Sequence, residues 1–282
     1  MRLANRGGRA WLVDETGRGN DLALASRDRF GPDPMQALER LDAIRSWAAA
    51  ARLAPGEPLA LRTLGPPVPR PRAVYAIGLN YRDHAAEAKL ELPQAPMVFT
   101  KFPSCLAGPA DDVPLSSSRV DYEAELVVVI GRAAKRVAAE HALEIVAGYC
   151  VGQDISDRRL QFQDKPPQFS LGKSLAGFGP IGPWLTTLDE LRDPNDLAIR
   201  CAVDGVEVQA SRTRELVFSV PELIAYLSRH CALEPGDLIF TGTPAGVGSL
   251  RQPPRYLAAG QRIETEIEGL GRLENRCVSP PA

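Results

Sequence analysis

The segment Asp121-Tyr122-Glu123-Ala124-Glu125-Leu126-Val127-Val128-Val129-Ile130-Gly131 decides the fold of this chain. Its apolar run, Leu126 to Ile130, is mostly β-branched and predicts a fully buried strand. Glu123 and Glu125 precede the run at a spacing of two, so on an extended backbone they share one face, with roughly 6–7 Å between their Cα atoms. Two carboxylates at the mouth of a hydrophobic core are costly unless a positive charge compensates them, and a single ion would do so.

A second Glu-x-Glu pattern near the C-terminus provides an internal control. Glu264, Glu266 and Glu268 alternate with isoleucine and threonine, which is typical of a strand with one face in the core and one in water. We expect these carboxylates to be solvated. The spacing alone therefore does not identify a metal site, and the argument for the first pair depends on its surroundings.

Length and composition exclude several classes of protein. The chain has 282 residues, enough for one large domain or a large and a small one. Its formal net charge is −2 with no basic stripe, so no nucleic-acid partner is expected. The 5 cysteines are scattered and never form C-x-x-C, as in reduced cytoplasmic proteins. No segment has the apolar run of a membrane span or a signal peptide, so we expect a cytoplasmic protein without a membrane partner.

Two units are expected, 1–70 and 71–282. In the first, apolar positions at helical spacing predict a helix over 34–51 within a small α+β unit, and the proline-rich stretch 64–71 is the boundary. In the second, helical spacing also predicts a helix over 138–149. Ser219 and Glu222 form a capping box that predicts the start of another helix.

His84 and Glu87 follow a predicted strand, 73–78, on what we expect to be a short helix capped by Asp83. At a spacing of three they are neighbours, so the carboxylate can hold the imidazole in one tautomer and raise its basicity. The alternative is an ordinary surface pair. The position directly after a strand favours a functional site, because loops at strand ends carry sites.

Asp154 is a third carboxylate at a strand end. It would complete a set of three oxygen ligands for a hard cation such as Mg²⁺ or Mn²⁺. Its alternative role is the N-cap of a helix starting at Ser156. Of the lysines, Lys101 is expected to be solvated, whereas Lys173, in a glycine-rich stretch that lacks the spacing of a P-loop, can neutralise a substrate carboxylate or an enolate. Gly242 and Thr243 follow a strand and offer an amide and a hydroxyl to an anion, with a plain turn as the alternative.

The order of these motifs resembles that of the fumarylacetoacetate hydrolase family. The segments are GLNYRDHAAE (78–87), DYEAELVVVIG (121–131), AGYCVGQDISDRRLQ (147–161), SLGKSLAGFGPIGPW (170–184) and DLIFTGTPAGVG (237–248). The resemblance runs from about Val74 to the C-terminus. It implies an α+β fold whose catalytic domain is a mixed, barrel-like β-roll, preceded by the small N-terminal domain, and a homodimer that binds Mg²⁺ or Mn²⁺.

The resemblance also assigns roles to residues of this chain. It implies metal ligands at Glu123, Glu125 and Asp154, an acid–base pair at His84 and Glu87, a catalytic lysine at Lys173, a substrate carboxylate held by Gly242 and Thr243, and a pocket-lining residue at Gln161. Two positions depart from the family pattern. Gln153 replaces the usual asparagine, and Ala176 replaces an acidic residue, which suggests a pocket altered near Lys173.

The leading interpretation is a divalent-metal-dependent hydrolase that cleaves a C–C bond in an acylpyruvate or related β-diketone 2-oxo acid. The cation polarises the carbonyl and stabilises an enolate, and Glu87 and His84 activate water. The alternatives are decarboxylation of an oxaloacetate-like acid, isomerisation or hydration in aromatic catabolism, a non-catalytic metal scaffold, and a structural dimer whose acidic cluster pairs only with Arg158 or Arg159.

Overall fold

The computed structural model describes residues 1–279. In this part of the chain a 12-stranded mixed sheet forms the centre, with β10 (Val120–Asp121) and β13 (Ser156–Asp157) paired beside it. The main path of the sheet runs β4 (Glu57–Pro58), β3 (Arg18–Asp21), β2 (Arg9–Val13), β1 (Arg2–Arg6), β14 (Gly179–Thr186), β12 (Val146–Gln153), β11 (Ala124–Ile130), β17 (Leu238–Phe240), β6 (Val74–Gly78) and β7 (Met97–Thr100). Two short strands lie off this path, β5 (Leu64–Gly65) beside β1 and β8 (Leu106–Ala107) beside β14.

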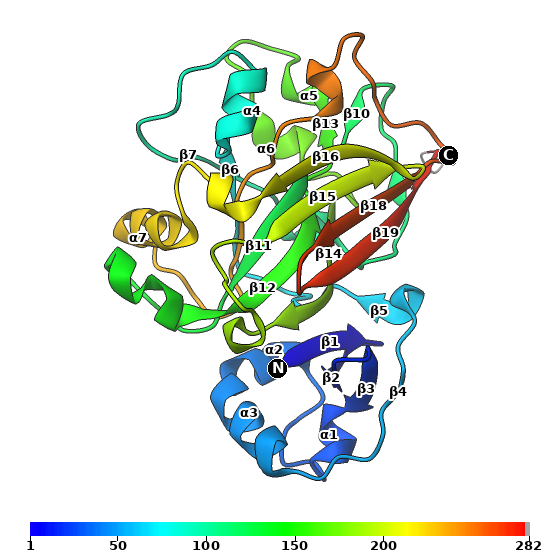
Figure 1. Cartoon of the computed structure of the whole chain (residues 1–282), viewed down its shortest axis with the longest axis vertical. Coiled ribbons are helices and arrows are strands. Elements are labelled where there is room, and N and C mark those ends of the chain that lie inside the picture. The colour runs from blue at the N-terminus through cyan, green and yellow to red at the C-terminus, as the bar shows by residue number, and fades with distance from the viewer. Residues whose placement is uncertain (280–282) are drawn as a thin grey trace.

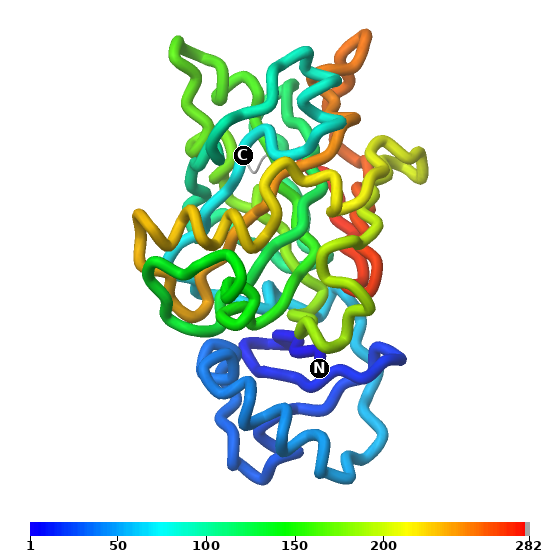
Figure 2. The backbone as a smooth tube through the Cα atoms, turned by 60° about the vertical axis from the view of Figure 1, so that its left-hand side comes forward, coloured from blue at the N-terminus to red at the C-terminus, as the bar shows by residue number. Residues whose placement is uncertain are grey.

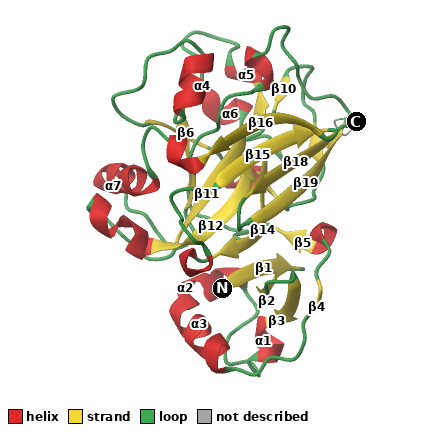
Figure 3. Cartoon of the chain, in the orientation of Figure 1, coloured by secondary structure: helices red, strands yellow, loops and turns green. Residues whose placement is uncertain are grey.

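A second sheet packs against the first in the upper part of the molecule (Figure 1). Its strand order is β16 (Val206–Arg212), β15 (Ala198–Val203), β18 (Arg262–Ile267), β19 (Gly271–Val278) and β9 (Val113–Pro114). The α-helices of the described residues lie around the two sheets (Figure 3). They are α1 (Leu22–Ala25), α2 (Pro34–Glu39), α3 (Leu41–Ala50), α4 (Arg82–Glu87), α5 (Arg158–Gln161), α6 (Phe169–Gly172) and α7 (Val220–His230).

Strand β11 is buried along its whole length, as its apolar sequence predicts. Its side chains alternate between two cores because successive residues point to opposite faces. Leu126 and Val128 lie in the core beneath the second sheet, whereas Val127 and Val129 lie in the core that reaches the N-terminal helices. A strand that is covered on both faces needs apolar side chains at every position. This requirement explains why β11 has the continuous apolar run from which it was predicted.

The N-terminal elements form the lower part of the molecule, and their sheet is continuous with the main one (Figure 2). Strand β1 pairs antiparallel with β14, with Leu3 opposite Leu185. The structure contains both helices and mixed sheets, which confirms this part of the predicted α+β class. The β-roll and the division at residue 70 remain predictions, and the last residues of the predicted catalytic unit, 280–282, lie outside the described part.

Two helix predictions are wrong in part. The predicted helix over 34–51 is two helices, α2 and α3, with a break at Arg40. The predicted helix over 138–149 is a 3₁₀ helix at Ala139–Ile145, after which β12 begins. Residues from Val146 onward pair with β11 along the strand, and this pairing overrides the helical spacing. The capping box of Ser219 and Glu222 is confirmed at the start of α7.

Within residues 1–279, no helix combines the length and the apolar character that crossing a membrane requires.

Candidate active site

Glu123, Glu125 and Asp154 come together as the sequence predicts. One carboxylate oxygen from each lies within 4.8 Å of the others, and all three side chains are buried. The pairing of β11 with β12 produces this arrangement, because Ala124 lies opposite Gln153 and the chain then continues to Asp154. The Asp154 amide donates to the Glu123 carbonyl at 2.9 Å, which fixes the two strand ends side by side.

Buried cations surround the three carboxylates. Lys173 Nζ donates to Glu123 Oε2 and to Asp154 Oδ2, both at 2.7 Å. Arg158 donates to Glu123 Oε1 at 2.6 Å and, through Nε, to Asp121 Oδ2 at 2.9 Å. One alternative from the sequence was an acidic cluster that only forms salt bridges with Arg158 or Arg159. Arg158 does form salt bridges with the cluster, whereas Arg159 forms none among the described residues.

The two glutamates differ in their electrostatics. Burial acts to raise the pKa of Glu123, but Lys173 and Arg158 outweigh it and hold that pKa below its ordinary value. Burial, together with the neighbouring Asp154 and Glu123 charges, raises the pKa of Glu125 well above its ordinary value. Among the described residues no basic side chain forms an ion pair with Glu125, so the cluster is short of positive charge at that carboxylate.

Lys101 corrects a prediction. We expected it to be solvated, but it is only 1% exposed. Its Nζ donates to Asp154 Oδ1 at 2.7 Å and to the carbonyls of Lys173 and Phe178. The side chain is buried because it pairs with Asp154 in the core, where a carboxylate without a partner would be costly, and a local sequence pattern does not reveal this pairing.

The helix α4 carries His84 and Glu87 at the predicted spacing. His84 Nδ1 lies 3.3 Å from Glu87 Oε2, and both Glu87 oxygens accept from the Gly246 amide at 3.0 Å. Asp83 is not the N-cap as predicted, because the helix begins two residues earlier, at Arg82, after Tyr81. The Asp83 carboxylate instead accepts from the hydroxyl of Ser211 at 2.7 Å and so ties α4 to β16.

Gly242 and Thr243 lie beside the carboxylates, but their polar groups are engaged within the protein. The Gly242 amide donates to Glu125 Oε2 at 2.8 Å, and the Thr243 hydroxyl donates to the Ala124 carbonyl at 2.9 Å. Gln161 is 2% exposed and accepts from Arg158 at 2.9 Å. The structure thus places these residues at the site, and their contact with a substrate stays a prediction.

Asp154 does not cap a helix, which removes its alternative role. Asp157 is the N-cap of α5 and accepts from the amides of Arg159 and Leu160. Ala176 is exposed and does not line the cavity beside Lys173, and a pocket altered by the missing acidic side chain stays a prediction.

A cavity of about 330 Å³ opens onto this cluster. Its polar lining residues are His84, Glu123, Glu125, Arg158, Gln161, Lys173, Thr243 and Ser249, and its walls are largely apolar. Leu79, at the end of β6, lines it with a φ of 53°. A non-glycine residue in the left-handed region is uncommon, and such strained positions concentrate at functional sites.

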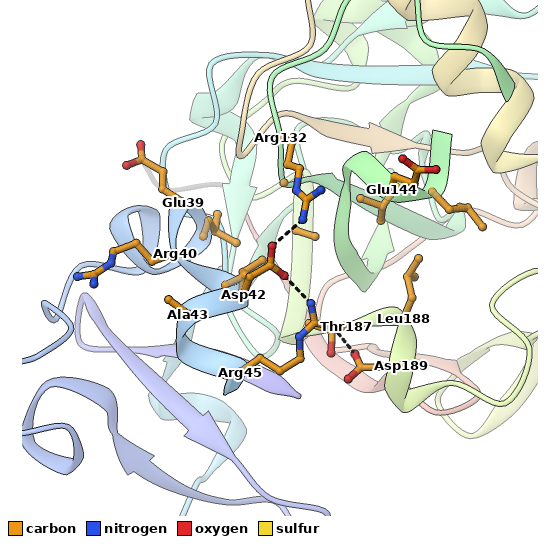
Figure 4. Close-up of a pocket in the computed structure, with 16 residues that line it drawn as sticks. Glu39, Arg40, Asp42, Ala43, Arg45, Arg132, Glu144, Thr187, Leu188 and Asp189 are labelled. Atoms are coloured by element: carbon orange, nitrogen blue, oxygen red, sulfur yellow. Dashed lines mark hydrogen bonds and ion pairs between the residues drawn. The ribbon is translucent and has the colours of Figure 1, made fainter. Parts of the chain in front are cut away.

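A larger cavity, of about 620 Å³, lies between the N-terminal helices and the main sheet (Figure 4). Four of its charged groups pair with one another: Asp42 pairs with Arg132 at 2.6 Å and with Arg45 at 2.5 Å, and Arg45 lies 3.5 Å from Asp189. These side chains are about half exposed, and they form no cluster of ligand atoms. The smaller cavity is the candidate site because, unlike the larger one, it is lined by the buried carboxylates Glu123 and Glu125.

The family model described as the fumarylacetoacetate hydrolase C-terminal region matches residues 73–278. The chain belongs to the fumarylacetoacetate hydrolase family. It is 42% identical to the human mitochondrial oxaloacetate tautomerase FAHD2A over 270 residues, covering 94% of this chain and 86% of that protein.

Solved structures of this family are also similar over their whole length. Maleylpyruvate hydrolase from Sphingobium sp. SYK-6, in complex with manganese(II) and pyruvate, is 32% identical with a TM-score of 0.83, and both chains are covered at 100%. The 2-hydroxyhepta-2,4-diene-1,7-dioate isomerase from Mycobacterium marinum is 28% identical with a TM-score of 0.75, again with 100% coverage of both. The relatives therefore include enzymes of different reaction types.

The site of this fumarylacetoacetate hydrolase family member fits a divalent cation. Three carboxylates supply the hard oxygen ligands that Mg²⁺ and Mn²⁺ prefer. Glu125, which forms no ion pair in the described chain, is where an added positive charge would be most stabilising.

Sequence reasoning missed supporting residues of the site. Gln209 accepts from the Ala124 amide at 2.9 Å and donates to Thr243 Oγ1 at 2.8 Å, so it joins the carboxylate strand to the Gly242 loop. Gln153, noted only as a departure, accepts from the Glu123 amide at 2.9 Å. The Glu123 amide lies in the break between β10 and β11 and the Ala124 amide at the start of β11, and a glutamine side chain accepts from each. Buried amides need partners, but no local sequence pattern shows which glutamines supply them.

Proposed function

We propose that this protein is a divalent-cation-dependent enzyme that hydrolyses a C–C bond in an acylpyruvate and releases pyruvate and a carboxylic acid. The observation that carries the proposal is that His84, backed by Glu87, and the buried carboxylates Glu123 and Glu125 line one cavity. A bound divalent cation would polarise the 2-oxo carbonyl and stabilise the enolate charge that develops on it.

The basic residues of the site hold Glu123 and Asp154 in place. Lys173 bridges Glu123 and Asp154, and Lys101 fixes the other oxygen of Asp154. We propose that Lys173 and Thr243 also contact the substrate carboxylate, since both line the cavity. Thr243 would then exchange its hydrogen bond to the Ala124 carbonyl for one to the substrate.

In the proposed reaction His84 takes a proton from a water molecule, which attacks the 4-carbonyl carbon of the acylpyruvate. The C3–C4 bond breaks, its electron pair passes to C3 as the enolate of pyruvate, and a proton is returned to C3. Glu87, held by the Gly246 amide, keeps the imidazole oriented throughout. Such general-base assistance contributes roughly 10²–10⁴ in rate. Pyruvate is the molecule bound with manganese in the Sphingobium hydrolase.

A second candidate is keto–enol tautomerisation of oxaloacetate, favoured by the 42% identity to the human tautomerase. It requires only that His84 move a proton between C3 and the 2-oxygen. Decarboxylation of keto-oxaloacetate would release CO2 and leave the enolate of pyruvate, and isomerisation of a 2-hydroxy-diene-dioate would pass through a dienolate, so both would use the same stabilisation of charge on the 2-oxygen. The homodimer and the cytoplasmic location remain predictions.

The test is turnover of acetylpyruvate, fumarylpyruvate and oxaloacetate with Mg²⁺, with Mn²⁺ and with EDTA. Loss of an acylpyruvate with formation of pyruvate, abolished by EDTA, is the expected result. Metal-dependent decay of enol-oxaloacetate without acylpyruvate cleavage would replace the hydrolase by the tautomerase. No metal-dependent turnover of any of the three would contradict both.

A further inference from the structure

The candidate site changes in character from its floor to its mouth. The floor holds the carboxylates, Lys173 and Thr243, which are at most 7% exposed. The walls that rise from it are aromatic and aliphatic, and they become progressively more exposed toward solvent. A substrate anchored by its 2-oxo acid end on the floor therefore points its other end along apolar walls.

One wall is a continuous series of phenylalanine rings. Lys173 Nζ lies 5.3 Å from the centroid of Phe99, which lies 5.5 Å from the centroid of Phe169, which in turn lies 6.1 Å from that of Phe162. Both ring pairs meet edge to face. Phe99 and Phe169 are partly buried and Phe162 is 56% exposed, so the series leads from the buried lysine to the mouth.

Aliphatic side chains also line the cavity toward solvent. Leu90, Met97 and Leu250 do so while being 58%, 43% and 36% exposed. The Met97 methyl lies directly against the Cα of Gly78, where no side chain intervenes. Apolar surface gathered at the mouth of a site is costly in water and is stabilised when a ligand covers it.

The cavity offers no free cation for a second carboxylate. Among the described lining residues the only permanently charged cations are Arg158 and Lys173, and both are paired with the acidic cluster. Lys89 and Lys165 lie on the neighbouring loops, but they are exposed and do not line the cavity. A carboxylate carried on the far end of the substrate would be desolvated against phenylalanine and leucine without a partner, which is unfavourable.

We infer that the substrate carries an apolar acyl group, alkyl or aryl, on its 4-carbonyl rather than a second carboxylate. This inference rests on the proposed function, because it takes the 2-oxo acid end to lie at the carboxylate cluster. The acyl chain lies along the rings of Phe99, Phe169 and Phe162. Each methylene added to the chain is buried against these rings and removed from water. The enzyme then selects its substrate by the length and polarity of the acyl group, which lies at the mouth of the cavity. The 2-oxo acid end, which lies on the floor, is common to all candidate substrates.

The test compares acylpyruvates that differ only at the far end, using the metal-loaded full-length protein. From acetylpyruvate to butanoylpyruvate and hexanoylpyruvate, kcat/KM is expected to rise by about fourfold for each methylene buried. Crotonylpyruvate, in which a methyl group replaces the distal carboxylate of fumarylpyruvate, is expected to exceed fumarylpyruvate by at least about tenfold. Equal values along the series, or a preference for fumarylpyruvate or oxaloacetate, would overturn the inference.

A matched pair of variants locates the effect. Phe162→Lys places a cation at the mouth and is expected to lower the preference for hexanoylpyruvate over fumarylpyruvate. Phe102→Lys is the control, because Phe102 is 47% exposed and does not line the cavity. If both variants change the preference equally, or neither does, the phenylalanine wall is not the subsite.

Binding separates failure of this inference from failure of the proposed function. Calorimetry with 2-oxooctanoate and 2-oxoadipate measures the preference without any bond cleavage, and tighter binding of 2-oxooctanoate is expected. If no acylpyruvate is cleaved but 2-oxooctanoate binds more tightly, the reaction is wrong and the apolar subsite stands. If acylpyruvates are cleaved but the two acids bind equally, the reaction stands and the subsite is wrong.

Discussion

The chain contains the same two short patterns twice, once at the candidate site and once on the surface. Glu123 and Glu125 are buried, whereas Glu264 and Glu266 lie on the half-exposed face of β18, with Glu266 paired to an exposed Arg200. This confirms the expectation that the second Glu-x-Glu is solvated. The spacing is identical, and the difference comes from what packs against each strand.

The His-x-x-Glu pattern is duplicated in the same way. His84 and Glu87 are 15% and 24% exposed and lie beside the cavity, whereas His141 and Glu144 are 64% and 67% exposed and lie on a surface 3₁₀ helix. The Glu144 hydrogen bond raises the pKa of His141, as expected for an imidazole beside a carboxylate. A motif becomes a site only where the fold removes water and supplies opposing charge.

The largest expected effect separates the two Glu-x-Glu segments. Glu125→Gln keeps the shape of the side chain but removes one of three anionic oxygen donors, so binding of Mn²⁺ or Mg²⁺ should fall by more than the roughly 10- to 100-fold that loss of a supporting residue costs a metal site. Titration calorimetry measures this. Glu266→Gln, at the surface, should bind the cation as the unmodified protein does, and equal affinities for the two variants would remove Glu125 from the site.

The second largest effect is expected when His84 and His141 are each replaced by alanine. His84→Ala removes the imidazole that faces the cavity and should lower turnover by roughly 10²–10⁴-fold, while metal affinity is retained. His141→Ala is the matched control and should leave both kcat and KM unchanged. Steady-state kinetics on the best acylpyruvate decides between them, and full turnover by the His84 variant would exclude its role as the base.

Sequence periodicity and residue chemistry predicted the parts of the site that are local. The apolar run after Glu125, the contact between His84 and Glu87 and the capping box of Ser219 all follow from spacing along one element. Asp154 emerged as a candidate because it follows a strand. Its place beside Glu123 depends on the register between β11 and β12, which no local pattern specifies.

The rest could not be predicted because it depends on partners far apart in the chain. Lys101 is separated from Asp154 by 53 positions, and Gln209 from Ala124 by 85. A lysine or glutamine is normally solvated whatever its neighbours in the chain, so residue type favours the wrong answer. Likewise the helical spacing near Ile145 lost to a strand pairing that only the folded sheet provides.

The cations that accompany the two Glu-x-Glu segments should differ in their contribution to stability. Lys101→Met leaves Asp154 buried with one cation fewer and should lower the free energy of unfolding of the metal-free protein by about 3–5 kcal/mol. Arg200→Met breaks an exposed pair with Glu266 and should cost at most about 1 kcal/mol. Urea denaturation measures both, and similar small losses would show that the buried charges are screened by water.

The smallest expected effect concerns how the backbone of Glu123 is held. Gln153 accepts from the Glu123 amide at 2.9 Å and donates to Thr265 Oγ1 at 2.8 Å, so its length spans from the carboxylate segment to β18. Gln153→Asn is shorter by one methylene and cannot keep both bonds, so it should cost about 1 kcal/mol of stability. Thr265→Val removes the acceptor in the same connection, and the double variant should therefore cost less than the sum of the single ones. Strict additivity in urea denaturation would mean that Gln153 supports Glu123 without using β18, and that the two Glu-x-Glu strands are energetically independent.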